Sequence, residues 1–224
     1  MGESIPEIVR DPAAIERRSM VIIGDELARM KKEIPTENLP VVKRAIHASA
    51  DFDYAENLCF LNTPMEAGKG AVKAGIPIVT DTNMAKAGIS VKGLSKLGGS
   101  VICHMAEPEI AAAAKRDGIT RAAAAVRLRA RIHDGAVYAV GNAPTALIEL
   151  ERQIRDGVRP SLVIGVPVGF VNVVESKERI LASCTKLGIP AIVALGRKGG
   201  STVAAAICNA LIYEAAGMQD PGSR

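Results

Sequence analysis

Three histidines are the side chains of this chain best suited to acid–base chemistry near neutral pH, and their neighbours differ. His47 follows Lys43 and Arg44 and precedes Asp51, at spacings that put all four on one helical face if the helix extends that far. Neighbouring cations disfavour a charged imidazole, whereas a bound polyanion favours it. An anionic substrate would therefore charge this ring on arrival, although histidines among surface lysines are more often idle.

The other two histidines have simpler interpretations. His133 ends an arginine-rich segment beside Asp134, which indicates a helix C-terminal cap or a solvated surface residue. His104 ends an apolar run, where a hydrogen-bonded core histidine is favoured over a ligand contact. His47 is therefore the leading candidate for acid–base chemistry.

Glycine-bearing segments offer a second kind of candidate site. The segment GRKGGS at 196–201 would hold an anion through backbone N–H groups, or it is simply a tight turn, and the residues alone favour neither. GNAPTAL at 141–147 is explained by a turn from a strand into a helix, with a glycine at the strand end, an asparagine able to cap and a proline in the first helical turn. The glycines at 165 and 169 would let a flat ligand approach the backbone. The chain has no GxxxxGK(S/T) phosphate-binding loop, and no GxGxxG motif follows the first predicted strand.

The elements that must position these residues can be read from the sequence after residue 75, where short apolar runs alternate with helical patterns. Five runs predict strands, at 76–80, 101–104, 136–140, 162–166 and 191–195. The segments between them predict helices, at 107–117, 120–131, 144–156 and 175–187. Because the runs lack polar alternation, they fit strands buried on both faces of a parallel sheet. A ligand should then lie beyond the carboxyl ends of the strands.

The chain before residue 75 reads as helical. Asp11 and Pro12 begin one helix, Thr36 can cap a second that carries His47, and Thr63 precedes a third. The predicted fold is therefore an α/β class, three-layer α/β/α sandwich with a five-stranded parallel sheet, preceded by N-terminal helices. We expect residues 1–224 to form a single domain.

Composition narrows the class of partner. The chain has a net charge of +4 with its cations interspersed among acids, and it has three Phe, three Tyr and no Trp. This favours a small anionic ligand and disfavours nucleic acid. Four cysteines without a CxxC pair suggest neither a zinc cage nor disulfides. With no apolar signal core or membrane-spanning stretch, the protein is expected to be soluble and cytoplasmic.

The segment VVKRAIHASADFDYAENL at 41–58 resembles the precorrin-8X and cobalt-precorrin-8 methylmutases of cobalamin biosynthesis. The resemblance runs from about Asp11 to Ala215 and includes RDPAAIERRS, IVTDTNMAKAGI, DGITRA, GNAPTALIELE, IGVPVGFVNVVESKE and GRKGGSTVAAAICNAL, all in the family's order. It implies a flavodoxin-like fold and a homodimer with substrate bound near the interface. The tracts ADFDYAEN and NVVESKE look closer to the cobalt-dependent branch.

The resemblance also implies the chemistry. The enzyme would be an isomerase that moves the methyl group at C-11 of a ring-contracted corrinoid to C-12, giving hydrogenobyrinic acid or its cobalt counterpart, cobyrinic acid. No external methyl donor, cofactor or metal ligand set is implied. His47 takes the place of the family's catalytic acid, which protonates a ring nitrogen and promotes a 1,5-sigmatropic shift. Ser19, Arg44 and Arg121 match its substrate contacts.

Two alternatives from other classes remain open. One is a flavodoxin-like cofactor-binding protein without catalysis, for which aromatic stacking at strand ends would be expected, and only Phe170 lies there. The other is a corrinoid carrier that passes intermediates between enzymes. Turnover of the corrinoid separates the methylmutase from both.

Overall fold

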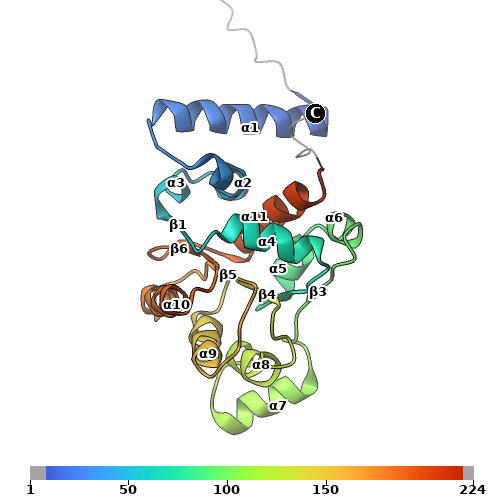
Figure 1. Cartoon of the computed structure of the whole chain (residues 1–224), viewed down its shortest axis with the longest axis vertical. Coiled ribbons are helices and arrows are strands. Elements are labelled where there is room, and N and C mark those ends of the chain that lie inside the picture. The colour runs from blue at the N-terminus through green and yellow to red at the C-terminus, as the bar shows by residue number, and fades with distance from the viewer. Residues whose placement is uncertain (1–8, 219–224) are drawn as a thin grey trace, which may run out of the picture.

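Helices cover both faces of one mixed sheet in the computed structural model, which describes residues 9–218 (Figure 1). The helices are α1 (Pro12–Arg29), the 3₁₀ turn η1 (Thr36–Asn38), α2 (Leu39–Ser49), α3 (Tyr54–Asn57), α4 (Pro64–Lys73), α5 (Asn83–Gly88), α6 (Val91–Ser95), α7 (Pro108–Asp117), α8 (Arg121–Arg129), α9 (Pro144–Arg155), α10 (Val173–Leu187) and α11 (Ser201–Ala215). The strands are β1 (Leu58–Leu61), β2 (Ile78–Thr80), β3 (Val101–Ile102), β4 (Val137–Val140), β5 (Leu162–Gly165) and β6 (Ala191–Ala194). No helix within residues 9–218 is long and apolar enough to cross a membrane.

The six strands lie in the order β1-β6-β5-β4-β2-β3. All five predicted strands form and pair in parallel, but the prediction of a five-stranded sheet is wrong by one. The additional strand, β1, runs antiparallel to β6 at the edge, with Leu58 opposite Ala194 and Leu61 opposite Ala191. This four-residue apolar run lies in the stretch expected to be helical, and a run so short has no periodicity that distinguishes strand from helix.

Two apolar clusters fill the space on either side of the sheet. The cluster beneath α2, α4 and α11 includes Ile46, Ile164 and Leu211. The cluster beneath α8, α9 and α10 includes Leu150 and Ile180. Beyond α2, α1 forms an outer layer that packs on α2 (Figure 1).

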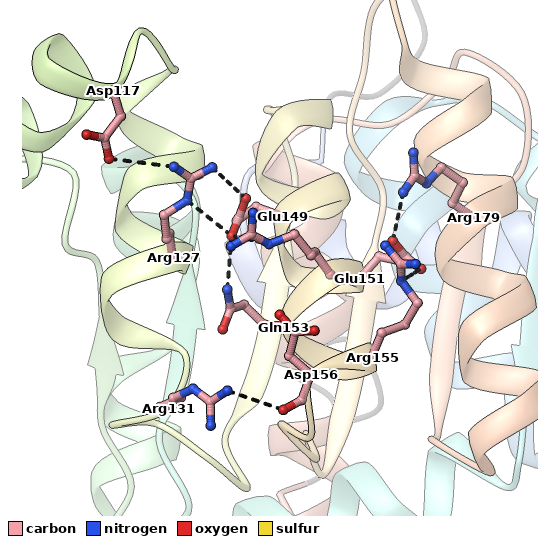
Figure 2. A network of polar contacts seen from close by, with 10 residues as sticks. Asp117, Arg127, Arg131, Glu149, Glu151, Gln153, Arg155, Asp156 and Arg179 are labelled. Atoms are coloured by element: carbon pink, nitrogen blue, oxygen red, sulfur yellow. Dashed lines mark hydrogen bonds and ion pairs between the residues drawn. The ribbon is translucent and has the colours of Figure 1, made fainter.

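Buried carboxylates on α9 join the three helices of the second layer (Figure 2). Glu149 accepts hydrogen bonds from Arg127 of α8, at 3.1 Å, and from Gln153. Glu151 accepts from Arg179 of α10, at 3.0 Å. Both carboxylates are almost fully buried, so each needs these partners to offset the loss of hydration. Many of the chain's arginines are therefore paired internally, on the face of the sheet opposite α2.

The helix boundaries follow local chemistry where a capping residue is present. Asp11 caps α1 as predicted, because its carboxylate accepts the N–H of Ala14 at 2.8 Å. The prediction that Thr36 caps the second helix is wrong, since Thr36 begins η1 and α2 starts at Leu39. α2 ends at Ser49 because Ala50 adopts a left-handed conformation with φ of 54°.

His104, which follows β3, pairs with His133, which follows α8. From the sequence, His133 is predicted to be a helix cap or a solvated surface residue. His104 Nε2 and His133 Nε2 are 2.8 Å apart and the two rings stack. His104 also bonds Glu107 through Nδ1, and Arg129 bonds the same carboxylate. The interpretation of His133 was wrong because its partner lies 29 residues away in the chain.

We expect this pair to make the free energy of unfolding depend on pH. Burial, and then the positive charges of His104 and Arg129, lower the pKa of His133, so its protonation is penalised in the folded state. The contribution of His133 to stability is therefore full above its unfolded pKa of about 6.5 and is lost as the pH falls through the lower folded value. Urea unfolding at pH 7.5 and 5.5 should show a larger loss for the wild type than for His133→Gln. Equal losses in the two proteins would contradict this account.

Candidate active site

His47 lies in the last turn of α2, on the side that faces away from the core. Val41, Val42, Ala45 and Ile46 are the buried face of this helix, and α2 packs through them against α11. His47 follows the buried Ile46 directly, and its side chain is exposed. The periodicity of α2 therefore orients its apolar face inward and delivers a titratable ring to the surface.

Two hollows meet at His47. The first, of 310 Å³, lies between α2, α5 and α11 and is lined by Arg44, Met84, Thr202 and Asn209 together with His47. The second, of 230 Å³, lies between α1 and α2 and is lined by Ser19, Ile22, Ile23, Glu26, Ile46, His47, Ala50 and Phe52. Of the residues that line these hollows, His47 is common to both. A ligand that fills either one therefore lies against His47.

Arg44 is held in place by helices on both of its sides. Its Nη1 lies 2.7 Å from Oε1 of Glu16 on α1, and its guanidinium group lies over the ring of Tyr213 on α11, 5.1 Å from the ring centre. An arginine stacked on an aromatic ring and paired with a carboxylate has a fixed plane. The structure thus places Arg44 beside His47 with a preset orientation.

Asp51 does not share the helical face of His47, because the helix does not extend that far. The left-handed Ala50 ends α2 before Asp51 is reached. The Asp51 carboxylate instead lies 2.6 Å from Nζ of Lys198, which also pairs with Asp53. The hydrogen bond from Lys198 lowers the pKa of Asp51. This bridge ties the end of α2 to the turn between β6 and α11.

Ser19 and Arg121 have different relations to His47. Ser19 lines the second hollow, and its hydroxyl donates to the carbonyl of Ile15 at 2.9 Å, which leaves the oxygen lone pairs available to accept. Arg121 is exposed at the start of α8, which covers the other face of the sheet. The structure therefore brings Ser19, Arg44 and His47 together and leaves Arg121 apart.

Sequence reasoning missed Asp81, a buried carboxylate at the end of β2. It accepts the backbone N–H groups of Gly141, Asn142 and Ala143, at 2.9, 2.8 and 2.7 Å. Burial raises the pKa of Asp81, and these three donors oppose that rise. The crevice between β2 and β4, where backbone N–H groups would otherwise face a ligand, is therefore occupied by the protein's own anion. An acidic residue directly after a predicted buried strand was the available signal.

Two of the three glycines of GRKGGS, Gly199 and Gly200, are required by the geometry of the turn. A Cβ at Gly199 would lie 2.1 Å from the carbonyl oxygen of Val166, which no side chain can do. Gly200 has φ of 138° and donates its N–H to the same oxygen at 2.9 Å. The tight-turn interpretation therefore accounts for both glycines.

Comparisons with known proteins agree over nearly the whole chain. A family model described as Precorrin-8X methylmutase matches residues 14–214. The cobalt-precorrin-8 methylmutase of Priestia megaterium is 40% identical over 201 residues, which cover 89% of this chain and 87% of that protein. The precorrin-8X methylmutase of Sinorhizobium sp is 36% identical over 208 residues, 92% of this chain and 96% of that protein. The solved precorrin-8x methyl mutase of Thermus thermophilus has a TM-score of 0.82 and 41% identity, covering 91% and 98% of the two chains.

Proposed function

This chain belongs to the precorrin-8X methylmutase family, and we propose that it moves the C-11 methyl group of a precorrin-8 macrocycle to C-12 with His47 as the acid. The observation that carries the proposal is the position of His47, where the hollow that holds Arg44 meets the hollow that holds Ser19. A macrocycle placed over α2 would contact all three side chains.

The reaction requires little more than a proton and a fixed geometry. Transfer of a proton from the His47 imidazolium to a ring nitrogen draws electron density from the conjugated system and weakens the bond to the migrating methyl carbon. The bond between C-11 and the methyl carbon breaks as the bond to C-12 forms, and the proton returns to His47.

Arg44 and Ser19 supply the contacts that hold a substrate rich in carboxylates. A guanidinium group pairs with a carboxylate through two parallel N–H donors, which fixes both distance and angle. Glu16 and Tyr213 set the plane of this group before substrate arrives. A preset donor loses less conformational entropy on binding than a mobile lysine would.

The alternative of a nucleotide- or flavin-binding protein fits the site less well. The Asp81 carboxyl group occupies the crevice between β2 and β4 and already accepts the backbone N–H groups that a phosphate would need there. Phe170 is the aromatic residue expected at the strand ends, and Arg197 already lies over its ring at 5.6 Å. The corrinoid carrier remains the second candidate, and only turnover separates it from the isomerase.

The finer features of the fold and assembly belong to the same proposal. Numbered among themselves, the five parallel strands run 2-1-3-4-5, which supports a flavodoxin-like arrangement. The single sheet supports one domain over residues 1–224. Exposed Ile15, Val21 and Ile22 on α1 support a homodimer whose interface adjoins the second hollow. The four cysteines are free thiols, which supports a reducing cytoplasm.

We expect His47→Ala to fold and to bind corrinoid within a few-fold of wild type while losing turnover by about 10²–10⁴-fold, the usual contribution of a positioned acid. Purified protein is incubated with precorrin-8, and the absorbance change follows the rearranged conjugation. His133→Gln, assayed at pH 7.5, is the matched control because its imidazole lies outside both hollows. Undiminished turnover by His47→Ala would reject the mechanism, and bound but unconverted substrate in the wild type would favour the carrier.

Arg44→Lys keeps the charge but loses the planar fork, so we expect the corrinoid affinity to fall by about tenfold or more. A solvated salt bridge is worth only ~0–1 kcal/mol, which corresponds to fivefold or less. Absorbance titration with the corrinoid measures the dissociation constant. Arg155→Lys is the control, since Arg155 pairs with Glu151 on the other face of the sheet. An affinity unchanged by Arg44→Lys would place Arg44 outside the binding site.

The substrate is expected to carry cobalt. The Priestia megaterium relative, at 40% identity, is named for cobalt-precorrin-8, and the Sinorhizobium sp relative, at 36%, for precorrin-8X. We expect kcat/KM to be higher for cobalt-precorrin-8 than for the metal-free macrocycle. Equal values, or a preference for the metal-free form, would overturn this assignment.

A further inference from the structure

A buried lysine lies behind the turn that leads into α11. Lys177, on α10, is 1% exposed. Its ammonium group donates to the carbonyl oxygens of Gly196 and Lys198, each at 2.8 Å. Among the described residues no carboxylate pairs with it. The mechanism proposed above makes no use of this cation.

A cation at such a position is costly unless its donors are satisfied. Burial lowers the pKa of Lys177 to about 8, so the group is still mostly protonated at neutral pH. An apolar side chain would fill the same space without a loss of hydration, but it would leave both carbonyl oxygens without this donor. The ammonium group of Lys177 therefore holds the backbone of the turn in place through two hydrogen bonds.

The carbonyl groups of this turn are hydrogen-bonded to neighbouring segments of the chain. Those of Gly196 and Lys198 accept from Lys177, and that of Arg197 accepts the N–H of Gly169 at 3.3 Å. The side chain of Lys198 reaches the opposite way, to Asp51 and Asp53. Lys198 therefore takes part in both interactions: its carbonyl group accepts from Lys177, and its ammonium group pairs with Asp51.

Two routes lead from this turn to the candidate active site. Through Lys198 the turn holds Asp51, which lies four residues after His47. Through Gly199 and Gly200 the turn begins α11, whose Thr202 lines the first hollow beside His47. A shift of the turn would move both sides of that hollow.

We propose that Lys177 is a positioning residue of the active site: by holding the carbonyls of Gly196 and Lys198, it fixes the Lys198 bridge that anchors the His47 end of α2. The inference rests on the proposed function. Lys177 acts through the turn and does not touch the corrinoid.

A double-mutant cycle tests the route. We expect Lys177→Met and Lys198→Met each to lower kcat by about tenfold, with KM within threefold, because the acid is misplaced while Arg44 remains. The double variant should be no worse than the more damaging single variant, since both substitutions release the same bridge. Lys186→Met, on the exposed face of α10, is the matched control and should keep the wild-type kcat.

Three results would overturn the proposal. They are a wild-type kcat in folded Lys177→Met, effects of the two single variants that multiply in the double variant, and a wild-type kcat in Lys198→Met. The last remains informative even where Lys177→Met fails to fold, because Lys198 is exposed and its replacement leaves the core intact.

Hydrogen–deuterium exchange provides a readout that needs no turnover. Lys177→Met should speed amide exchange within residues 196–203 and 50–53, and Lys186→Met should not. Unchanged exchange in both segments would overturn the positioning role whatever the enzyme does. An inactive wild type with the expected exchange pattern would instead overturn the proposed function and leave the role of Lys177 in the turn standing.

Discussion

Helix α11 has to be buried on two sides, and that constraint sets the geometry of the site. Eleven of its residues are buried, most of them alanine or small aliphatic side chains. The sheet covers one side, and α2, whose buried residues include Val42 and Ile46, packs on the other. Because the small side chains of α11 allow close approach, the end of α2 lies over the first turns of α11. His47 reaches its place beside α11 through this packing.

The parts of the fold that are visible in the sequence are those with local causes. Strands buried on both faces appear as apolar runs, and Asp11 caps its helix within three residues. β1 depends on pairing with a strand more than 130 residues later, and His133 depends on His104. The left-handed Ala50 has no local signal in the sequence, and it ends α2 before Asp51 can share the face of His47. Pairings made by folding leave no periodicity to detect.

Of the candidate residues named from the sequence, Ser19, Arg44 and His47 lie together in the structure and Arg121 does not. Spacing identified His47 as a titratable group among cations, and the resemblance to the methylmutases supplied an acid with a substrate. Ser19 joins it across a hollow because α1 packs on α2. The net positive charge was a weaker guide, because Arg127, Arg155 and Arg179 are paired with buried carboxylates of α9 (Figure 2). Overall charge does not locate a binding face when the cations have internal partners.

Two buried side chains, Asp81 and Lys177, bond the backbone groups at the carboxyl edge of the sheet. Asp81 takes up the backbone N–H groups that follow β4, and Lys177 takes up the carbonyl groups that follow β6. Backbone groups that bind phosphates and cofactors in related architectures are therefore engaged by the protein's own side chains. The surface beside α2, where His47 and the oriented Arg44 line a hollow, stays open to a ligand. A reaction that needs one proton and a firmly held ring requires no more.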